Sequence, residues 1–384
     1  MSSTVADLET FVPAHGSDAA VSCHANDAPP CLEDDLVRLY GHVHSSLPFF
    51  ETSRPMAGAR VYVARDGGRP SAIFVFAIRR GELTVFNEMA RVSRTEIERF
   101  AAHAFREFPE VALVRFPAVE TDRGALRFPT QRYDAKEDWV ADLPPTPEAY
   151  TASLSKKTRD TIKSHLRKLQ REHPSFTVEV QRAEQICPTL VRDIIALSRA
   201  NIFAKKKMFG IDEAEADRIV RLSRRIGVVV ALRIDGRLCG GSVNYAVGDR
   251  WLGEVIAHDA AFNRYSLGSV VCHLTLCESI ARGARKFHMG GGRNPYKAKA
   301  GGIRHDMECL VLYRSYPHLA LNAHKAARVG VERVMRRAKV WMLEHDRSVL
   351  TRAVFNTLHI LRSLVPGRRA DGDDTRPAEA PSTR

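Results

Sequence analysis

The stretch from Trp251 to Gly302 reads WLGEVIAHDAAFNRYSLGSVVCHLTLCESIARGARKFHMGGGRNPYKAKAGG. Its pattern predicts a strand, a turn with Ser and Gly, a long apolar helix, a short strand and a glycine run followed by Asn-Pro-Tyr-Lys. In this order, the N-terminus of the helix lies next to the end of a strand. The first backbone N–H groups of a helix have no partner within it, and they carry the positive end of its dipole. The stretch therefore predicts a site for a phosphate-bearing ligand.

The composition is that of a globular protein with one or two domains. Of the 384 residues, 44% are hydrophobic and 27% are charged. There is no apolar run of 18 residues, which a transmembrane helix requires, and the N-terminus lacks the pattern of a secretory signal. The seven cysteines are scattered, with no CxxC pair or zinc knuckle. We therefore expect a cytoplasmic protein with reduced thiols and no metal site.

The formal net charge of +13 favours an anionic ligand, nucleic acid or an acidic membrane surface. Part of this charge lies far from the stretch quoted above. Residues 321–370 contain 11 Lys and Arg against 3 Asp and Glu. The charge alone therefore does not identify the ligand.

A proline-rich break at residues 144–147 separates two series of predicted elements in the same order. Each has a three-stranded meander with an Asp-Gly turn, then a helix, a strand and a late strand. The first series covers 61–65, 71–79, 83–86, 93–108, 111–116 and 133–143. The second covers 228–234, 238–247, 251–256, 267–281, 286–289 and 306–314, after helices at 150–172, 183–200 and 212–225. This repetition predicts two copies of one α/β unit with mixed sheets.

The chain divides into five parts. Residues 1–32 and 367–384 are rich in small and polar residues without periodicity, so we expect disorder there. The two α/β units cover 33–147 and 148–316. Residues 317–366 form an amphipathic helical extension. We expect it to pack on the core or on a second subunit; the alternative is peripheral contact with the anionic inner membrane surface.

Three segments of the second unit resemble a known family. They are Leu154–Arg159 with its basic helix, Phe262–Gly268, and the glycines and Tyr-Lys of Gly290–Lys297. Together with the order of elements, they resemble GNAT acyltransferases of the duplicated, FemAB-like branch, and within it the acetyltransferases associated with bacterial cellulose and polysaccharide biosynthesis. The resemblance is good over residues 150–316 and extends to 33–143 by pattern only. The chain departs from the family at Leu267, where proline is usual, and at His288, where aspartate is common.

The resemblance implies direct transfer of an acetyl or other acyl group from acyl-CoA to an amine or hydroxyl, without a metal. The acceptor would be a saccharide, a lipid-linked intermediate or an amine. Arg264 lies four residues before Gly268, whereas the usual phosphate loop has three. The donor therefore stays open between acyl-CoA and, as in Fem-type enzymes, aminoacyl-tRNA. A third possibility is a binding protein that has lost catalysis, and the first unit is expected to be degenerate because it lacks both motifs.

The predicted donor site is the turn before the helix. Small residues there allow the backbone to approach a pyrophosphate, and an arginine adds charge. The residues are Arg264, Tyr265, Ser266, Leu267, Gly268, Ser269 and Val270. The alternative interpretation is a capped helix without a ligand.

Four residues are candidates for catalysis. Glu254 lies in an otherwise apolar strand and is a candidate general base, although alternation places it on the solvent face equally well. His258, at the strand end, ranks level with it. The resemblance implies that Tyr296 is the general acid, and Lys297 is a candidate to hold a phosphate or an oxyanion. The alternative for this pair is a packed aromatic ring and a solvated lysine.

Overall fold

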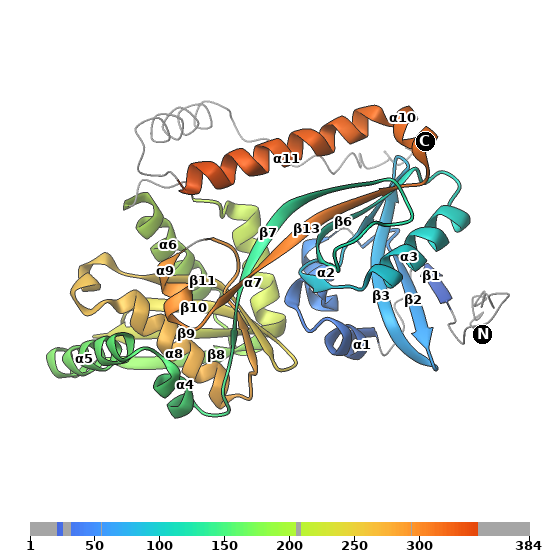
Figure 1. The fold of residues 1–384 in the computed structure, drawn as a ribbon. Coiled ribbons are helices and arrows are strands. Elements are labelled where there is room, and N and C mark those ends of the chain that lie inside the picture. The colour runs from blue at the N-terminus through green and yellow to red at the C-terminus, as the bar shows by residue number, and fades with distance from the viewer. Residues whose placement is uncertain (1–20, 26–31, 55, 205–208, 293, 345–384) are drawn as a thin grey trace, which may run out of the picture. The chain divides into compact units, whose positions relative to one another are not determined.

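The computed structural model describes residues 21–25, 32–54, 56–204, 209–292 and 294–344 (Figure 1). The chain divides into two compact units, Met1–Arg336 and Arg337–Arg384. The first unit contains every described strand, and of the second only the end of one helix is described. The expected disordered tail, and the extension beyond Glu344, lie outside the described residues.

The first copy of the repeated unit has the predicted meander, helix and strands. Its elements are β1 (Val21–Ala25), α1 (Leu32–Leu39), η1 (Val43–Ser45), α2 (Leu47–Ser53), β2 (Arg60–Asp66), β3 (Arg69–Arg79), β4 (Glu82–Val85), β5 (Ala90–Arg91), α3 (Arg94–Glu107), β6 (Leu113–Glu120) and β7 (Thr130–Asp142). The Ser93 side chain caps α3 by accepting a hydrogen bond from the Glu96 amide. The expectation of disorder over 1–32 is wrong for Val21–Ala25, because this segment forms a strand that pairs with β2.

The second copy also follows the predicted order. Its elements are α4 (Pro147–Ser153), α5 (Lys156–Glu172), β8 (Thr177–Arg182), η2 (Ala183–Gln185), α6 (Pro188–Ala204), α7 (Glu213–Ile226), β9 (Gly227–Ile234), β10 (Arg237–Val247), β11 (Arg250–His258), η3 (Ala260–Tyr265), α8 (Leu267–Ala281), β12 (Lys286–His288), α9 (Pro295–Lys299) and β13 (Ile303–Tyr313).

Two predicted helices of the second copy differ from the structure. The single helix predicted over 150–172 is broken, because Leu154 is extended and the Ser155 side chain caps a new helix at the Thr158 amide. The helix predicted over 183–200 begins only at Pro188, since a short 3-10 turn precedes it.

The two copies share one sheet and exchange their last strands. The strand order is β1-β2-β3-β4-β6-β13-β7-β12-β11-β10-β9-β8, with β5 beside β6. Thus β13, from the end of the second copy, pairs with β6 of the first, and β7 pairs with β12 of the second. Figure 1 shows β7 and β13 side by side between the two copies. In each copy a helix connects two parallel neighbours, β4 to β6 and β11 to β12. The predicted tandem α/β fold is therefore confirmed.

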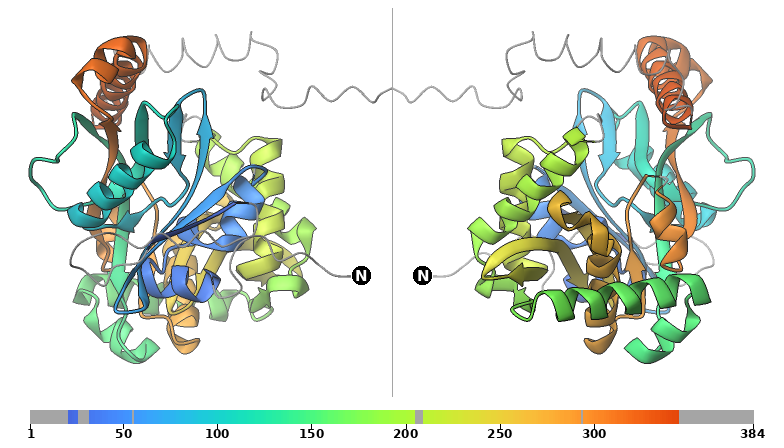
Figure 2. Two further views of the ribbon diagram at one scale, coloured as in Figure 1. Left: turned by 90° about the vertical axis from the view of Figure 1, so that its right-hand side faces the viewer. Right: turned by 90° about the vertical axis from the view of Figure 1, so that its left-hand side faces the viewer.

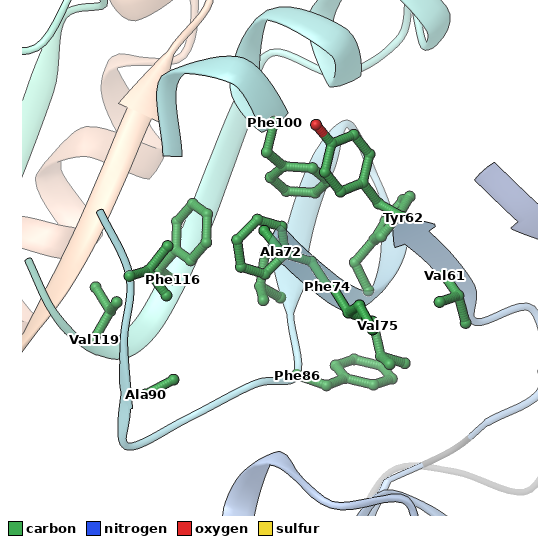
Figure 3. Packing of buried hydrophobic residues seen from close by; sticks show 14 of the residues in the cluster. Val61, Tyr62, Ala72, Phe74, Val75, Phe86, Ala90, Phe100, Phe116 and Val119 are labelled. Carbon is green, nitrogen blue, oxygen red and sulfur yellow. The ribbon is translucent and has the colours of Figure 1, made fainter. Parts of the chain in front are cut away.

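Alternation along the strands gives each copy its core. In the first copy, Tyr62, Phe74, Phe100 and Phe116 form an aromatic cluster between the meander and α3 (Figure 3). In the second copy, Val229 and Ala231 of β9 pack in the cluster of α6 and α7, which lie beside each other in Figure 2. The intervening residues, Val230 and Leu232, pack in the cluster of α5 and α8. Helices therefore cover both faces of this half of the sheet.

The helical extension begins with α10 (Tyr316–Leu321) and α11 (Ala323–Glu344). Val329 is buried in a cluster with Leu113 and Tyr313, as expected for packing on the core. Val331, Val334 and Met335 are exposed on α11. Membrane contact by the extension stays a prediction. No helix among the described residues is long and apolar enough to span a bilayer.

Candidate active site

The site begins where two parallel strands separate. β11 and β12 pair only from Arg250–Lys286 to Leu252–His288, after which β12 ends and β11 continues to His258. On its other edge, β11 has a register shift against β10: Val255 pairs with Val243 and Gly253 with Asn244. Glu254 is therefore the extra residue of a β-bulge, a feature that re-aims a side chain and interrupts a ladder.

A cavity of about 340 Å³ occupies this opening. Gly253, Glu254, Val255 and Ile256 of β11 form one wall. The rest of the lining includes Cys272 and Thr275 of α8, Met289 and Gly291 after β12, Tyr296 and Lys297 of α9, and residues of α6 and β10. Three of the four predicted catalytic residues, Glu254, Tyr296 and Lys297, therefore line one cavity. This convergence is what an acyl-transfer site requires.

Glu254 is held by an arginine that the sequence did not single out. Its Oε1 accepts a hydrogen bond from Arg218 Nη2 at 2.9 Å, and the same nitrogen bonds Glu215 at 2.6 Å. The Glu254 side chain is 18% exposed. Burial raises the pKa of Glu254 above its usual value, although Arg218 opposes the shift. A carboxylate with a raised pKa is a suitable proton acceptor near neutral pH.

The glycine run after β12 is fixed from two sides. On one side, β7 supplies carboxylates: Asp138 Oδ1 accepts from the Gly290 amide and Glu137 Oε1 from the Gly292 amide, both at 3.0 Å. On the other side, Lys297 Nζ donates to the carbonyl oxygens of Gly290 at 2.8 Å and Gly291 at 2.6 Å. Gly290 and Gly292 have positive φ angles that favour glycine. The exchanged strand β7 thus helps to shape the site of the second copy.

Lys297 is 2% exposed, which rules out the alternative of a solvated lysine. Burial lowers the pKa of its ammonium group from 10.5 to about 8. Two of its three N–H donors bond these carbonyl oxygens, so the geometry makes it a residue that positions the loop. Its predicted role with a phosphate or an oxyanion stays a prediction.

We expect Lys297→Met to lower the free energy of unfolding by about 1–3 kcal/mol at pH 7, because two loop carbonyls lose their donor. The wild-type ammonium loses its proton in the folded protein at about pH 8 but keeps it to 10.5 when unfolded. Between these two pH values the unfolded state binds more protons than the folded state. The free energy of unfolding of the wild type therefore rises with pH, whereas that of the variant has no such term. The difference in stability between the two proteins is thus larger at high pH. Urea unfolding at pH 7 and 9.5 measures it, with the exposed neighbour Lys299→Met as control. An equal loss of stability in both variants would show that Lys297 does not hold the glycine loop in place.

Tyr296 and Cys272 are the remaining reactive groups of the cavity. Burial raises the pKa of the Tyr296 hydroxyl, so this group keeps its proton and can only donate it. Burial also raises the pKa of the Cys272 thiol to about 12, so the thiol is not a nucleophile near neutral pH. A protonated thiol does not form an acyl-cysteine intermediate, so these two groups favour direct transfer of the acyl group from donor to acceptor.

The predicted donor turn lies at the far end of β11. Ser266 has a left-handed φ of 47°, and its side chain makes no capping hydrogen bond, so the start of α8 presents backbone groups. Tyr265, Leu267 and Val270 are buried, so their side chains hold the turn in place and do not face outward. The Tyr265 hydroxyl donates to Glu172 Oε2 at 2.6 Å. The accessible members of the turn are Arg264, Ser266, Gly268 and Ser269.

The structure places His258 with this turn and not in the cavity of Glu254. Its Nε2 lies 3.0 Å from Asn263 Oδ1, and a Cβ atom on Gly268 would lie 3.0 Å from the His258 ring. The two candidate bases, ranked level from the sequence, are thus at opposite ends of the exposed edge of β11.

His288 belongs to a buried cluster with Asp138 and His42. Its Nδ1 lies 2.6 Å from Asp138 Oδ2. Nδ1 of His42 accepts from the His44 amide at 3.1 Å, and its Nε2 lies 3.9 Å from the same oxygen, beyond hydrogen-bond distance. The other oxygen of Asp138 accepts from the Gly290 amide, so Asp138 joins His288 to the Gly290 loop.

Sequence reasoning missed the polar floor of the cavity. Asn244 Nδ2 donates to Ser242 Oγ at 2.9 Å, and Ser242 Oγ lies 2.7 Å from Thr275 Oγ1. All three residues are buried. The available signal was the break in the apolar alternation of β10 at Ser242 and Asn244.

Comparisons with known proteins agree with the fold. Residues 156–298 match the family model described as Acetyltransferase (GNAT) domain. No curated protein matches the chain. The crystal structure of FemX is similar with a TM-score of 0.58 and 10% identity, over 78% of this chain and 99% of that one. At this identity, the likeness shows the fold alone.

Two further structures are similar at lower scores. One is the C-terminal domain of a putative lysylphosphatidylglycerol synthetase from Agrobacterium fabrum, with a TM-score of 0.46 and 13% identity over 75% of this chain and 92% of that one. The other is a tandem GNAT protein from the clavulanic acid biosynthesis pathway, with a TM-score of 0.41 and 12% identity over 76% and 97%. The chain has a tandem GNAT-like α/β fold, and its residues 156–298 are similar to the GNAT acetyltransferase domain.

Proposed function

We propose that this protein transfers an acetyl or other acyl group from acyl-CoA to an amine or hydroxyl acceptor. One observation carries the proposal: the bulge that aims Glu254 into the opening between β11 and β12. The acyl-pantetheine arm would lie along the exposed edge of β11. The pyrophosphate would meet the start of α8, where Gly268 and Ser269 allow close approach and Arg264 supplies charge.

The chemistry follows from the residues of the cavity. Glu254 takes a proton from the acceptor while the nitrogen or oxygen attacks the thioester carbon. The new bond to that carbon forms, the carbon–sulfur bond breaks, and Tyr296 gives its proton to the leaving thiolate. Backbone N–H groups near the bulge and the fixed loop at Gly291 would stabilise the oxyanion. Solvent then returns the proton from Glu254 to Tyr296.

A Fem-type transfer from aminoacyl-tRNA is the second candidate. The observation that favours it is the row of exposed cations on α5, which are Lys156, Lys157, Lys163, Arg167 and Arg171. Such a row is also an ordinary solvated helix face. The sequence resemblance to polysaccharide acetyltransferases supports acyl-CoA instead, and with it a role in polysaccharide or cell-envelope biosynthesis.

Thermal-shift and calorimetric titrations with acetyl-CoA, CoA and bulk tRNA, at two salt concentrations, test the donor. A ligand that binds only the native state raises the melting temperature. We expect stabilisation by acetyl-CoA and CoA. Stabilisation by tRNA alone, lost at high salt, would replace the proposal with aminoacyl transfer. No response to any of them would leave a binding protein without catalysis.

A further inference from the structure

A second cavity, of about 480 Å³, lies on the other side of the bulge. It shares Gly253, Glu254, Met289 and Gly291 with the first cavity. The rest of its lining includes residues from the first copy, among them His44, Phe49, Arg54 and Glu88, and Lys136 of the exchanged strand β7. Glu254 thus faces two spaces, which is the arrangement needed for two substrates that meet at one carboxylate.

The positive and negative charges that line this cavity are equal in number. Its three cations are Arg54, Lys136 and Arg218, and its three carboxylates are Glu88, Glu215 and Glu254. Arg54 and Lys136 both bond Glu88, whereas Arg218 bonds Glu215 and Glu254. Glu88 is buried and its pKa is lowered by these two cations, so it stays ionised. The charges therefore form two groups, one around Glu88 and one around Glu254.

Two guanidinium donors of these groups have no acceptor among the described residues. They are Arg54 Nε and Arg218 Nη1, and both atoms are buried. A buried donor without a partner destabilises the protein. A guanidinium group prefers a planar oxyanion, to which it can donate two parallel hydrogen bonds. The unpaired donors therefore point to a ligand with a carboxylate.

We propose that the second cavity binds the acyl acceptor, and that this acceptor is an amino acid or a similar zwitterion. This inference rests on the proposed acyl transfer. The carboxylate of the acceptor pairs with the free donors of Arg54 and Arg218. Its ammonium group lies at Glu254 and loses one proton to solvent. Glu254 takes a second proton while the resulting amine attacks the thioester carbon. A cavity with balanced charges suits a zwitterion better than a plain amine or a neutral saccharide, neither of which supplies the missing oxyanion.

Matched acceptors test the proposal with the intact protein. Thiol release from acetyl-CoA is measured with L-phenylalanine against phenethylamine, L-lysine against cadaverine, and glucosamine as a saccharide amine, and mass spectrometry identifies each product. We expect kcat/KM to be at least about 100-fold higher for each amino acid than for its decarboxylated partner, since two hydrogen bonds to charged groups are at stake. In Arg54→Gln we expect this ratio to fall at least tenfold, with most of the change in KM of the amino acid.

The outcomes separate this inference from the proposed function. Equal use of amino acids and decarboxylated amines, or a preference for glucosamine, would overturn the zwitterion while acyl transfer stands. An equal loss for both members of a pair in Arg54→Gln would also overturn it, because a structural defect does not distinguish the two. Failure of acetyl-CoA to bind in the titration described above would overturn acyl transfer itself.

Discussion

Glu254→Gln is expected to lower kcat by about 10²–10⁴-fold, the usual contribution of a general base. The amide keeps the shape of the side chain and can still accept a hydrogen bond from Arg218, but it cannot take a proton. Because burial raises the pKa of Glu254, the wild-type rate falls on acidification at a pH above the usual range of a glutamate. The variant loses this limb of the profile. Steady-state rates of thiol release from pH 5 to 9, with the best acceptor of the panel, measure both effects.

The matched control is Glu213→Gln on α7. Glu213 pairs with Arg192 and Arg199 on the surface and lies outside both cavities. We expect it to keep the wild-type rate and profile, and we expect both variants to bind CoA normally. A Glu254→Gln protein within threefold of the wild-type kcat would exclude this residue as the base and return His258 to consideration.

Gly268→Asp is expected to weaken CoA binding by at least about 100-fold, equivalent to the loss of one or two hydrogen bonds to charged groups. A Cβ atom at this position would lie 3.0 Å from the His258 ring, so the ring must yield by a few tenths of an ångström. The new carboxylate would also occupy the start of α8 and repel a phosphate. Calorimetric titration with CoA measures the affinity.

Gly330→Asp is the control, because Gly330 is also a helical glycine and a Cβ atom there meets no atom within 4 Å. Gly268→Ala is a milder second variant, in which the His258 ring must yield by a few tenths of an ångström. We expect it to fold and to bind CoA with intermediate affinity. Normal CoA binding by a folded Gly268→Asp protein would contradict the assignment of this turn as the donor site.

Local signals explain what could be predicted of the fold. The hairpin turns at Asp66–Gly67 and Asp235–Gly236 depend on residues a few positions apart, and the structure confirms them. The break before Ser155 was missed because the apolar spacing continues across it, while its cause is a single capping hydroxyl. The exchange of β7 and β13 depends on pairing between residues nearly 200 positions apart, such as Val311 with Arg115, and no local pattern encodes it.

The same exchange explains what was missed in the site. Asp138 and Glu137 hold the glycine loop only because β7 lies beside β12. Arg54 and Glu88 belong to the copy expected to be degenerate, and no sequence pattern places them near Glu254. The alternation of apolar and polar residues could not predict on which face of the sheet the Glu254 side chain lies. A β-bulge moves a side chain to the other face, and no sequence pattern marks this bulge.

Hydrogen exchange of the full chain, with and without saturating acetyl-CoA, tests the central claim most directly. The claim is that the donor lies along the free edge of β11 and meets the start of α8. We predict slower exchange in peptides that cover residues 253–258 and 266–271, and little change in the corresponding segments of the first copy, β4 and the start of α3. Binding of acetyl-CoA that leaves residues 253–258 and 266–271 unprotected would contradict the account.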